Sequence, residues 1–388
     1  MWYGTCTWGF RWVERRCADM PNQKNRRRRG RVFTSTRDGS GVGWGWGIDM
    51  TGLSYPDRFG SVGAAVAFVL WIHLAGLALG APPGEAWQAP LGQDHPLVGR
   101  IWDVVAGEFI DSTVLVERLK RGRFVLLGEK HDNPDHHRLQ AWLLRALIAA
   151  GRRPAVGFEM FTVDDAPAIA RQLAAHPTDA AGLAAAVYWQ RSGWPEWVMY
   201  QPIAEAALQT NLPIIATNLA PATARSLAQH GAAGLDPTFA AQYGLDRPLA
   251  PEMQTALAEE IRAAHCGYVA DEAQVNAMLL MQRARDAQMA ESLAATEQPD
   301  GAVLIAGAGH VRHDYGIPAY LASRMPEASV ISVAFLEVSQ DRVEPTAYAA
   351  RFRRQTLPVD VVWFTPRVDD DDPCAAFAEH LKKLQKAK

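Results

Sequence analysis

The sequence is poor in cysteine and lacks two common catalytic motifs. It has four cysteines in 388 residues, and none of them has the CxxC spacing that is typical of metal sites. If the chain is exported and its N-terminal part removed, only Cys266 and Cys374 remain, either as a disulfide or as two unrelated buried thiols. No GxSxG or HExxH motif occurs. A serine nucleophile is therefore not expected, and no local motif supports a zinc site.

A surplus of positive charge is also missing from most of the chain. The formal net charge is −3, but residues 1–60 carry +6, mostly in the run from Arg26 to Arg29, so the remaining residues carry −9. An acidic body repels the phosphates of DNA and RNA. The charge distribution therefore argues against nucleic acid as a partner.

Residues 1–97 do not have the composition of a packed domain. Residues 1–60 are rich in Trp, Gly and Arg, and we expect them to be disordered or to result from a start site placed too early, with Met50 a plausible start. Residues 61–80 carry no charge and precede a Pro-rich segment, which predicts either a cleaved signal peptide or a membrane anchor. Residues 81–97 are expected to be a linker. The chain is thus predicted to be exported to the periplasm or another extracytoplasmic space, with possible membrane association through residues 62–80.

Short β-rich apolar runs alternate with Ala/Leu-rich stretches of helical spacing over residues 98–366. The apolar runs are Phe124–Leu127, Ala155–Phe158, Pro213–Thr217, Ala302–Ala306, Val330–Val338 and Val359–Phe364. Buried strands that alternate with helices are typical of a parallel sheet covered on both faces. We therefore predict an α/β fold with a mainly parallel β-sheet flanked by helices.

Two connections are too long for one crossover helix. They span about residues 164–209 and 222–297, and both are Ala-rich with a helical pattern. We expect them to form a small all-helical cap domain inserted in the α/β body. Residues 367–388 are expected to be a tail with an acidic run and a basic end.

The stretch VLLGEKHDNPDHHRLQ, from Val125 to Gln140, joins an apolar run to a helix start. Asn133 followed by Pro134 predicts an N-cap and the first helical position. The residues before Asn133 then form a loop at the carboxyl end of a strand, where parallel sheets bind ligands. Capping does not require Glu129 or His131, so both are candidate site residues.

Polar residues follow three further strands in the same way. They are Glu159, Asn218 and the group Gly307, Gly309, His310, Arg312 and His313. Each feature alone is weak, because a single polar residue after a strand is often a satisfied loop residue. Four strand ends that offer polar groups at one edge are less easily explained by chance. We therefore expect Glu129, His131, Glu159 and His310 to converge on one site.

Together these segments resemble a known family. The motifs LLGEKHDNPDHHRLQ, GFEMF, WPEWVMYQPI, LPIIATNL, RDAQMAESL and IAGAGHVRHDYGIP, in this order, are similar to those of the ChaN-like haem-binding uptake proteins. That family belongs to a superfamily with the Tiki proteases, TraB-like proteins and erythromycin esterases. The resemblance covers about residues 98–366 and implies a role in haem or iron acquisition, a homodimer with two stacked haems, and a Tyr ligand to ferric iron.

The resemblance also implies site residues. The polar centre of the superfamily would fall on Glu129, His131, Glu159, Arg285, Asp286 and His310. Arg312 and His313 would join His310 as partners of the haem propionates or as donors around the haem. Tyr200 is the expected iron ligand, with Tyr188 and Tyr268 as rivals, because a phenolate suits ferric haem. Trp189, Trp194 and Trp197 would offer flat apolar surface to the porphyrin, or make an ordinary aromatic cluster.

Two functions remain open from the sequence. The first is an exported haem-binding protein that holds haem between the α/β core and the helical cap and needs no catalysis. The alternative is a hydrolase related to the Tiki proteases and erythromycin esterases. In that case Glu129, His131, Glu159 and His310 would activate water, alone or around a divalent metal ion.

Overall fold

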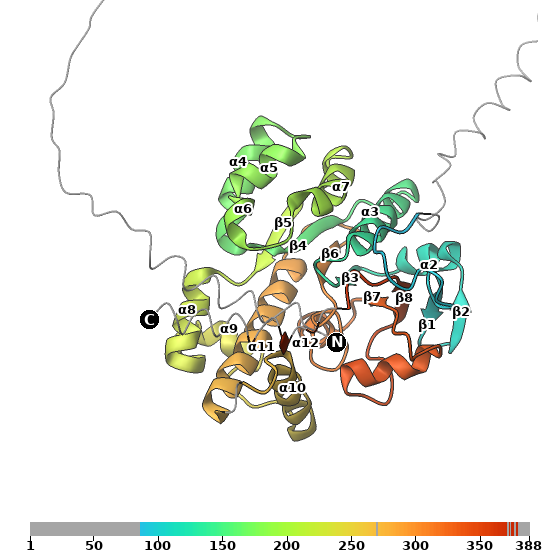
Figure 1. The fold of residues 1–388 in the computed structure, drawn as a ribbon. Coiled ribbons are helices and arrows are strands. Elements are labelled where there is room, and N and C mark those ends of the chain that lie inside the picture. The colour runs from blue at the N-terminus through green and yellow to red at the C-terminus, as the bar shows by residue number, and fades with distance from the viewer. Residues whose placement is uncertain (1–85, 269–270, 371, 373, 376–377, 379–388) are drawn as a thin grey trace, which may run out of the picture. The chain divides into compact units, whose positions relative to one another are not determined.

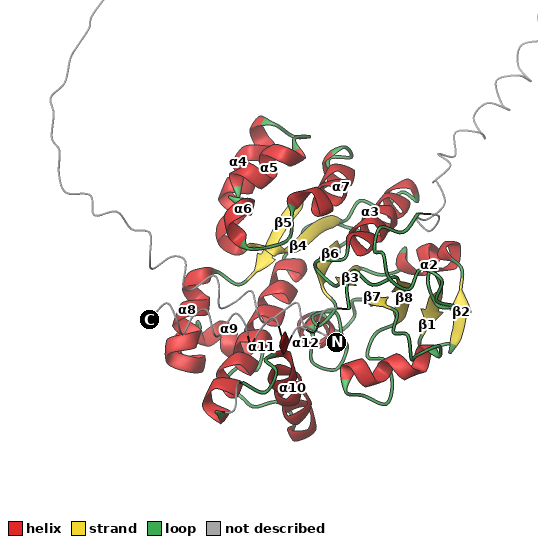
Figure 2. Cartoon of the chain, viewed as in Figure 1, coloured by secondary structure: helices red, strands yellow, loops and turns green. Residues whose placement is uncertain are grey.

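All six predicted strands occur in the computed structural model, as part of one eight-stranded sheet (Figure 1, Figure 2). The structure describes residues 86–268, 271–370, 372, 374, 375 and 378, so the predictions for residues 1–80 lie outside the described part. The strands are β1 (Ile101–Asp103), β2 (Glu108–Ile110), β3 (Phe124–Glu129), β4 (Ala155–Thr162), β5 (Ile214–Asn218), β6 (Ala302–Gly307), β7 (Val330–Glu337) and β8 (Val361–Thr365).

The sheet is mainly parallel, as predicted. Its strand order is β2-β1-β8-β7-β3-β6-β4-β5. Strands β3 to β8 pair in parallel, whereas β1 pairs antiparallel with both β2 and β8. The carboxyl ends of β3, β4, β5 and β6 therefore lie along one edge, with β6 between β3 and β4.

Helices cover both faces of this sheet. The α-helices are α2 (Ser112–Leu119), α3 (Pro134–Ala149), α4 (Ala166–Ala175), α5 (Ala180–Ala186), α6 (Trp189–Ser192), α7 (Trp197–Leu208), α8 (Pro221–His230), α9 (Pro237–Gln242), α10 (Pro251–Ala264), α11 (Glu272–Ala294) and α12 (Ile317–Arg324). Three 3₁₀ helices are η1 (Val163–Asp165), η2 (Gly231–Gly234) and η3 (Pro345–Phe352). Among the described residues, none of the helices is long and apolar enough to cross a membrane.

Successive residues of each central strand enter opposite cores. In β3, Val125 and Leu127 pack with α2, α3 and α7, while Phe124 and Leu126 pack with α8, α11 and α12. This alternation follows from the two-residue period of a strand. Because both faces are covered, the strand is apolar throughout, and the first charged residue appears only at its end, Glu129.

The two long connections are helical, as the sequence predicted. The first contains η1 and α4 to α7, and the second contains α8 to α11 with η2. Their description as a separate cap domain stays a prediction. The predicted start of α3 is confirmed, because Asn133 is its N-cap and its side chain accepts a hydrogen bond from the backbone N–H of Asp135 at 2.9 Å.

Part of the predicted linker, residues 86–97, packs on the body. The backbone N–H groups of Gln88 and Ala89 donate to the buried carboxylate of Asp135 at 2.8–3.0 Å. Leu91 then pairs with Arg367, just beyond β8, in an isolated antiparallel bridge. The start of the described chain and the residues after β8 therefore lie next to each other beside α3.

Candidate functional site

Glu129, the last residue of β3, is the centre of one buried polar group. Its Oε1 accepts hydrogen bonds from Nδ1 of His131 at 2.8 Å and from the hydroxyl of Tyr200 at 2.9 Å. Its Oε2 lies 3.2 Å from Nδ1 of His137. Burial alone would raise the pKa of Glu129, but the neighbouring imidazoles outweigh it and hold the pKa well below its usual range. Glu129 is therefore an anion at neutral pH.

The two histidines beside Glu129 have different environments. Both ring nitrogens of His137 face oxygen acceptors, Glu129 and Gln140 on one side and the carbonyl of His131 at 2.9 Å on the other. Although burial lowers the pKa of His137, these acceptors raise it above the usual value. His131 instead donates from Nδ1 to Glu129, while its Nε2 is buried and has no hydrogen-bond partner. A hydrogen on Nδ1 leaves the lone pair of this Nε2 available for a ligand or a proton.

Glu159, in β4, is the centre of a second group at the same edge. Its Oε2 accepts from the backbone N–H of Gly307, the last residue of β6, at 2.7 Å. Its Oε1 pairs with Arg285 of α11 and lies 3.2 Å from Nε2 of His310. Burial opposes the charged carboxylate, but His310 and Arg285 overcome this and hold the pKa of Glu159 well below its usual range.

His310 lies between two carboxylates. Its Nδ1 contacts Asp286 of α11, and its Nε2 faces Glu159. Burial disfavours the imidazolium, but Glu159 and Asp286 outweigh burial and raise the pKa of His310 to about 9. His310 is therefore a cation at neutral pH and has no free lone pair with which to accept a proton.

The β3–β6 ladder brings the two groups close together. Glu129 is the direct partner of Gly307 in this ladder, and Gly307 donates its N–H to Glu159. Adjacent strands lie about 4.8 Å apart, so both carboxylates flank the end of β6. Asn218, the last residue of β5, adds to this edge, because its amide donates to the carbonyl of Glu159 at 2.9 Å and its oxygen accepts from Arg285 at 3.2 Å.

Two residues predicted for the site lie in other clusters. Arg312 is completely buried, and its guanidinium is bound by Asp314 at 2.6 and 2.8 Å and by Glu260 of α10 at 2.8 Å. His313 lies 3.1 Å from Asp360 through Nε2. The polar residues that follow β6 thus separate, with His310 joining Glu159 while Arg312 and His313 stabilise neighbouring loops.

Tyr200 is part of the protein core. Its side chain is fully buried, and its ring contacts those of His137 and Trp189 at centroid distances of 4.2 and 5.1 Å. Burial and the nearby Glu129 raise its pKa well above 10, which disfavours a phenolate. The two other candidate tyrosines are exposed, in contrast to Tyr200: Tyr188 is 67% exposed and Tyr268 is 57% exposed.

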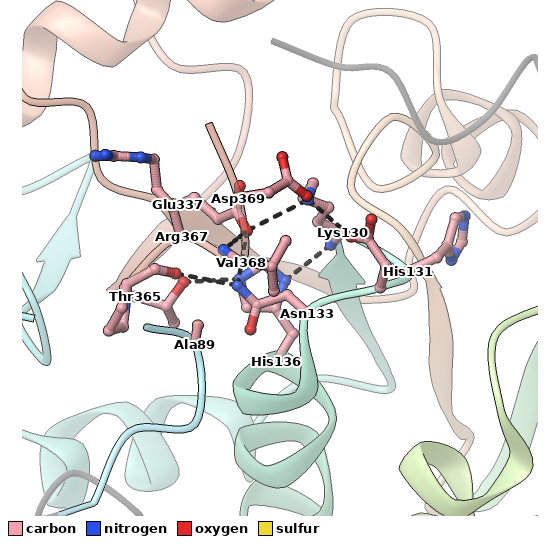
Figure 3. Close-up of polar contacts among 12 residues, drawn as sticks. Ala89, Lys130, His131, Asn133, His136, Glu337, Thr365, Arg367, Val368 and Asp369 are labelled. Atoms are coloured by element: carbon pink, nitrogen blue, oxygen red, sulfur yellow. Dashed lines mark hydrogen bonds and ion pairs between the residues drawn. The ribbon is translucent and has the colours of Figure 1, made fainter. Parts of the chain in front are cut away.

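Trp194 adjoins the Glu129 group, and three further apolar side chains, Tyr188, Trp197 and Val198, stand near it in the sequence. The ring of Trp194 meets that of His131 at a centroid distance of 4.9 Å. Tyr188 and Val198 are both 67% exposed, and their chain neighbours Trp189 and Trp197 contact each other at 4.8 Å. Figure 3 shows the ring of His131 pointing away from the contacts that join Lys130 to Asn133 and Glu337.

Tyr188 has an unusual backbone conformation and a cation beside its ring. Tyr188 is held in the left-handed backbone region, with φ 52°, which a bulky residue rarely adopts and which often marks a functional position. The guanidinium carbon of Arg191 lies 5.6 Å from the centre of the Tyr188 ring, so a cation is at hand for a propionate. Trp197 has a buried indole N–H without a partner, which could donate to a ligand.

Sequence reasoning did not assign a role to His137, Gln140 or Gln282. Asn133 is the N-cap of α3 and therefore fixes which side chains of the first helical turn face the preceding loop. This signal could have identified His137 from the sequence. Gln140 donates to the carbonyl of Leu127 at 3.0 Å, and the side-chain amide nitrogen of Gln282 lies 3.1 Å from Nδ1 of His310. Within the described ranges, no three His, Cys, Asp or Glu side chains are arranged to hold a metal ion.

Comparisons with known proteins agree with this fold. The model of one family, described as haem-binding uptake, Tiki superfamily, ChaN, matches residues 115–321. A solved structure described as cofacial heme binding to ChaN of Campylobacter jejuni is 18% identical, with a TM-score of 0.53, covering 68% of this chain and 95% of that one. No curated protein matches the chain.

Two other solved structures are less similar. An erythromycin esterase, EreC, in its open conformation is 14% identical with a TM-score of 0.39, covering 68% of this chain and 95% of that one. A type III effector, HopBA1, is 12% identical with a TM-score of 0.35, covering 65% and 92%. At these TM-scores neither structure supports a conclusion about this chain.

Proposed function

Because the chain belongs to the haem-binding uptake family of the Tiki superfamily, ChaN, we propose that it binds haem as part of iron uptake. The observation that carries the proposal is the contact between the rings of Trp194 and His131 beside the buried Glu129, with the exposed side chains of Tyr188 and Val198 close to Trp194 in the sequence. Two large side chains that are 67% exposed leave apolar area which a porphyrin could cover. Each buried CH₂ group would contribute about 0.8 kcal/mol to binding.

An exposed tyrosine is the better candidate for the iron ligand. Tyr200 would have to give up its hydrogen bond to Glu129 and ionise inside the core, against a pKa that burial raises. Tyr188 and Tyr268 are 67% and 57% exposed, so neither would have to ionise inside the core. When bound, haem would supply a ferric iron that a phenolate oxygen can ligate. The residues of the chain would hold the porphyrin plane and pair its propionates.

Titration of the purified protein with ferric haem tests the proposal. We expect a shifted Soret band and the charge-transfer band of a phenolate ligand. One of the variants Tyr188→Phe and Tyr268→Phe should lose the charge-transfer band, whereas Tyr200→Phe, the matched control, should keep it. Absence of any Soret shift would exclude haem binding by this protein. Loss of the band in Tyr200→Phe alone would show that Tyr200 is the iron ligand.

Export and dimerisation belong to the same proposal. The Cys266–Cys374 disulfide supports export, because disulfides persist in oxidising compartments. Cell fractionation followed by mass determination of the mature chain tests export and the cleavage expected near residue 80. Sedimentation with and without ferric haem tests the homodimer. A monomer at every haem concentration would contradict it.

The second candidate function, a hydrolase, rests on one atom. Nε2 of His131 is buried without a partner, while Glu129 holds the hydrogen on Nδ1, and this is the arrangement of a general base that accepts a proton from water. The cations His310 and Arg285 could then stabilise a developing oxyanion. A chromogenic carboxylic ester is a suitable probe. Turnover lost in His131→Gln but kept in His313→Gln, the matched control, would favour hydrolysis, and equal background rates in both would exclude it.

A further inference from the structure

The chain after β8 is bound to the loop that carries Glu129 and His131. The backbone N–H of Val368 donates to Oε1 of Glu337 at 3.0 Å, and the same oxygen accepts from the side chain of Asn133 at 2.9 Å (Figure 3). The amide of Asn133 also donates to the carbonyl of Pro366 at 3.1 Å. The tail and the start of α3 are thus joined through Glu337.

An ion pair extends this connection into the loop itself. The ammonium of Lys130 lies 3.7 Å from the carboxylate of Asp369 and 3.5 Å from that of Glu337. Lys130 stands between Glu129 and His131 in the chain, and its backbone N–H donates to Nδ1 of His136 at 2.8 Å. Any movement of the tail therefore acts on the backbone that positions both site residues.

A covalent bond fixes the other end of this segment. Cys374 is joined by a disulfide to Cys266, two residues after the end of α10, with 5.4 Å between the two Cα atoms. Three residues separate Cys374 from Asp370, which limits the distance between their Cα atoms to about 14 Å. The turn after α10 is thereby held close to the tail segment that binds Lys130 and Glu337.

We propose that the Cys266–Cys374 disulfide is a redox-sensitive clasp that holds the tail on the loop of Glu129 and His131. Apart from the disulfide, the described tail residues are held by the half-exposed ion pair of Asp369 with Lys130, by the bridge between Arg367 and Leu91, and by the hydrogen bonds to Asn133 and Glu337. Reduction therefore loosens the tail and, with it, the loop. This inference goes beyond haem binding and is independent of it, because it concerns the order of the loop in the protein without ligand.

The redox step requires a dithiol as reductant. A thiolate of the dithiol attacks one sulfur of the disulfide, forming a mixed disulfide and releasing the other cysteine as a thiolate that takes up a proton. The second thiol of the reductant then displaces the remaining cysteine. The protein gains two electrons and two protons, and the dithiol becomes a cyclic disulfide.

Hydrogen exchange of the full chain, followed residue by residue, tests the clasp. Reduction with dithiothreitol should speed exchange of the Arg367 and Val368 amides and of those from Lys130 to Asn133 at least tenfold. The central strand residues Leu126 and Leu304 should exchange at an unchanged rate. The double variant Cys266→Ser/Cys374→Ser should behave like the reduced protein and should not respond to dithiothreitol.

A second variant separates the ion pair from the disulfide. Asp369→Asn removes the tail's carboxylate from Lys130, which keeps Asp132 at 2.8 Å and Glu337 at 3.5 Å, and it leaves the covalent bond intact. It should therefore speed loop exchange less than reduction does. Unchanged exchange of the tail and loop on reduction would overturn the proposal. Equal acceleration in the central strands would also overturn it, because the disulfide would then stabilise the whole fold rather than hold the loop. Neither outcome depends on whether haem binds.

Discussion

Replacing His310 by asparagine should flatten the pH dependence of stability between pH 6.5 and 9. In the folded protein His310 lies between the carboxylates of Glu159 and Asp286, which raise its pKa from the ordinary 6.5 to about 9 in spite of burial. A group with a raised pKa in the folded state stabilises that state in its protonated form. Its contribution is fully present below pH 6.5 and is lost as the pH rises to about 9.

The size of this effect follows from the two pKa values. They differ by about 2.5, and each pKa unit corresponds to about 1.36 kcal/mol, so the linkage contribution of His310 is about 3 kcal/mol. His137 also has a raised pKa and contributes in the same direction. Because His137 is present in both proteins, its contribution largely cancels when the wild type is compared with His310→Asn.

Urea unfolding at a series of pH values measures this difference. The free energy of unfolding of the wild type should fall by about 3 kcal/mol more than that of His310→Asn between pH 6.5 and 9. Equal losses in the two proteins would refute the reasoning. If the variant does not fold, the imidazole resonance of His310 in the wild type provides a second measurement. A midpoint near 6.5 in that titration would show that Glu159 and Asp286 do not hold the proton.

Three further substitutions have defined outcomes. Gly128→Ala should lower the free energy of unfolding by about 3 kcal/mol in urea, because the new Cβ would lie 2.5 Å from the Val311 side chain. Tyr200→Phe removes a donor to the buried carboxylate of Glu129, so it should cost about 2 kcal/mol of stability. It should also broaden the Nδ1 proton resonance of His131, which donates to the same oxygen. Glu159→Gln removes the carboxylate that pairs with the buried His310 and the half-buried Arg285. It should therefore lower the melting temperature by an amount equivalent to about 4 kcal/mol, and an unchanged melting temperature would contradict its central place.

The sheet was predictable because its central strands are apolar throughout. Runs such as Phe124–Leu127 end at a charged residue, and this places Glu129 at the carboxyl edge. The strands β1 and β2 were not predicted, since each has three residues and no apolar run. Their pairing depends on contact with β8, which lies more than 250 residues further along the chain.

The grouping within the site was harder to predict than its position at the edge. His310, Arg312 and His313 are close in sequence, yet only His310 joins Glu159. The loop after β6 closes on itself, with the N–H of Ile317 donating to the carbonyl of His310, so the side chains diverge in directions that periodicity does not reveal. The contact between Tyr200 and Glu129 spans 71 residues. Only packing of α7 on α3 brings them together.

The carboxylate of Asp135, which receives the amides of Gln88 and Ala89, sets how far the chain can be shortened from its beginning. Removal of everything before residue 86 leaves both donors in place. A chain beginning at residue 90 would lack both donors and leave Arg138, at 2.9 Å, beside the carboxylate, so it should melt at a lower temperature. A truncation or fusion junction designed for this chain should therefore lie before Gln88, because the short segment that begins there is part of the folded body.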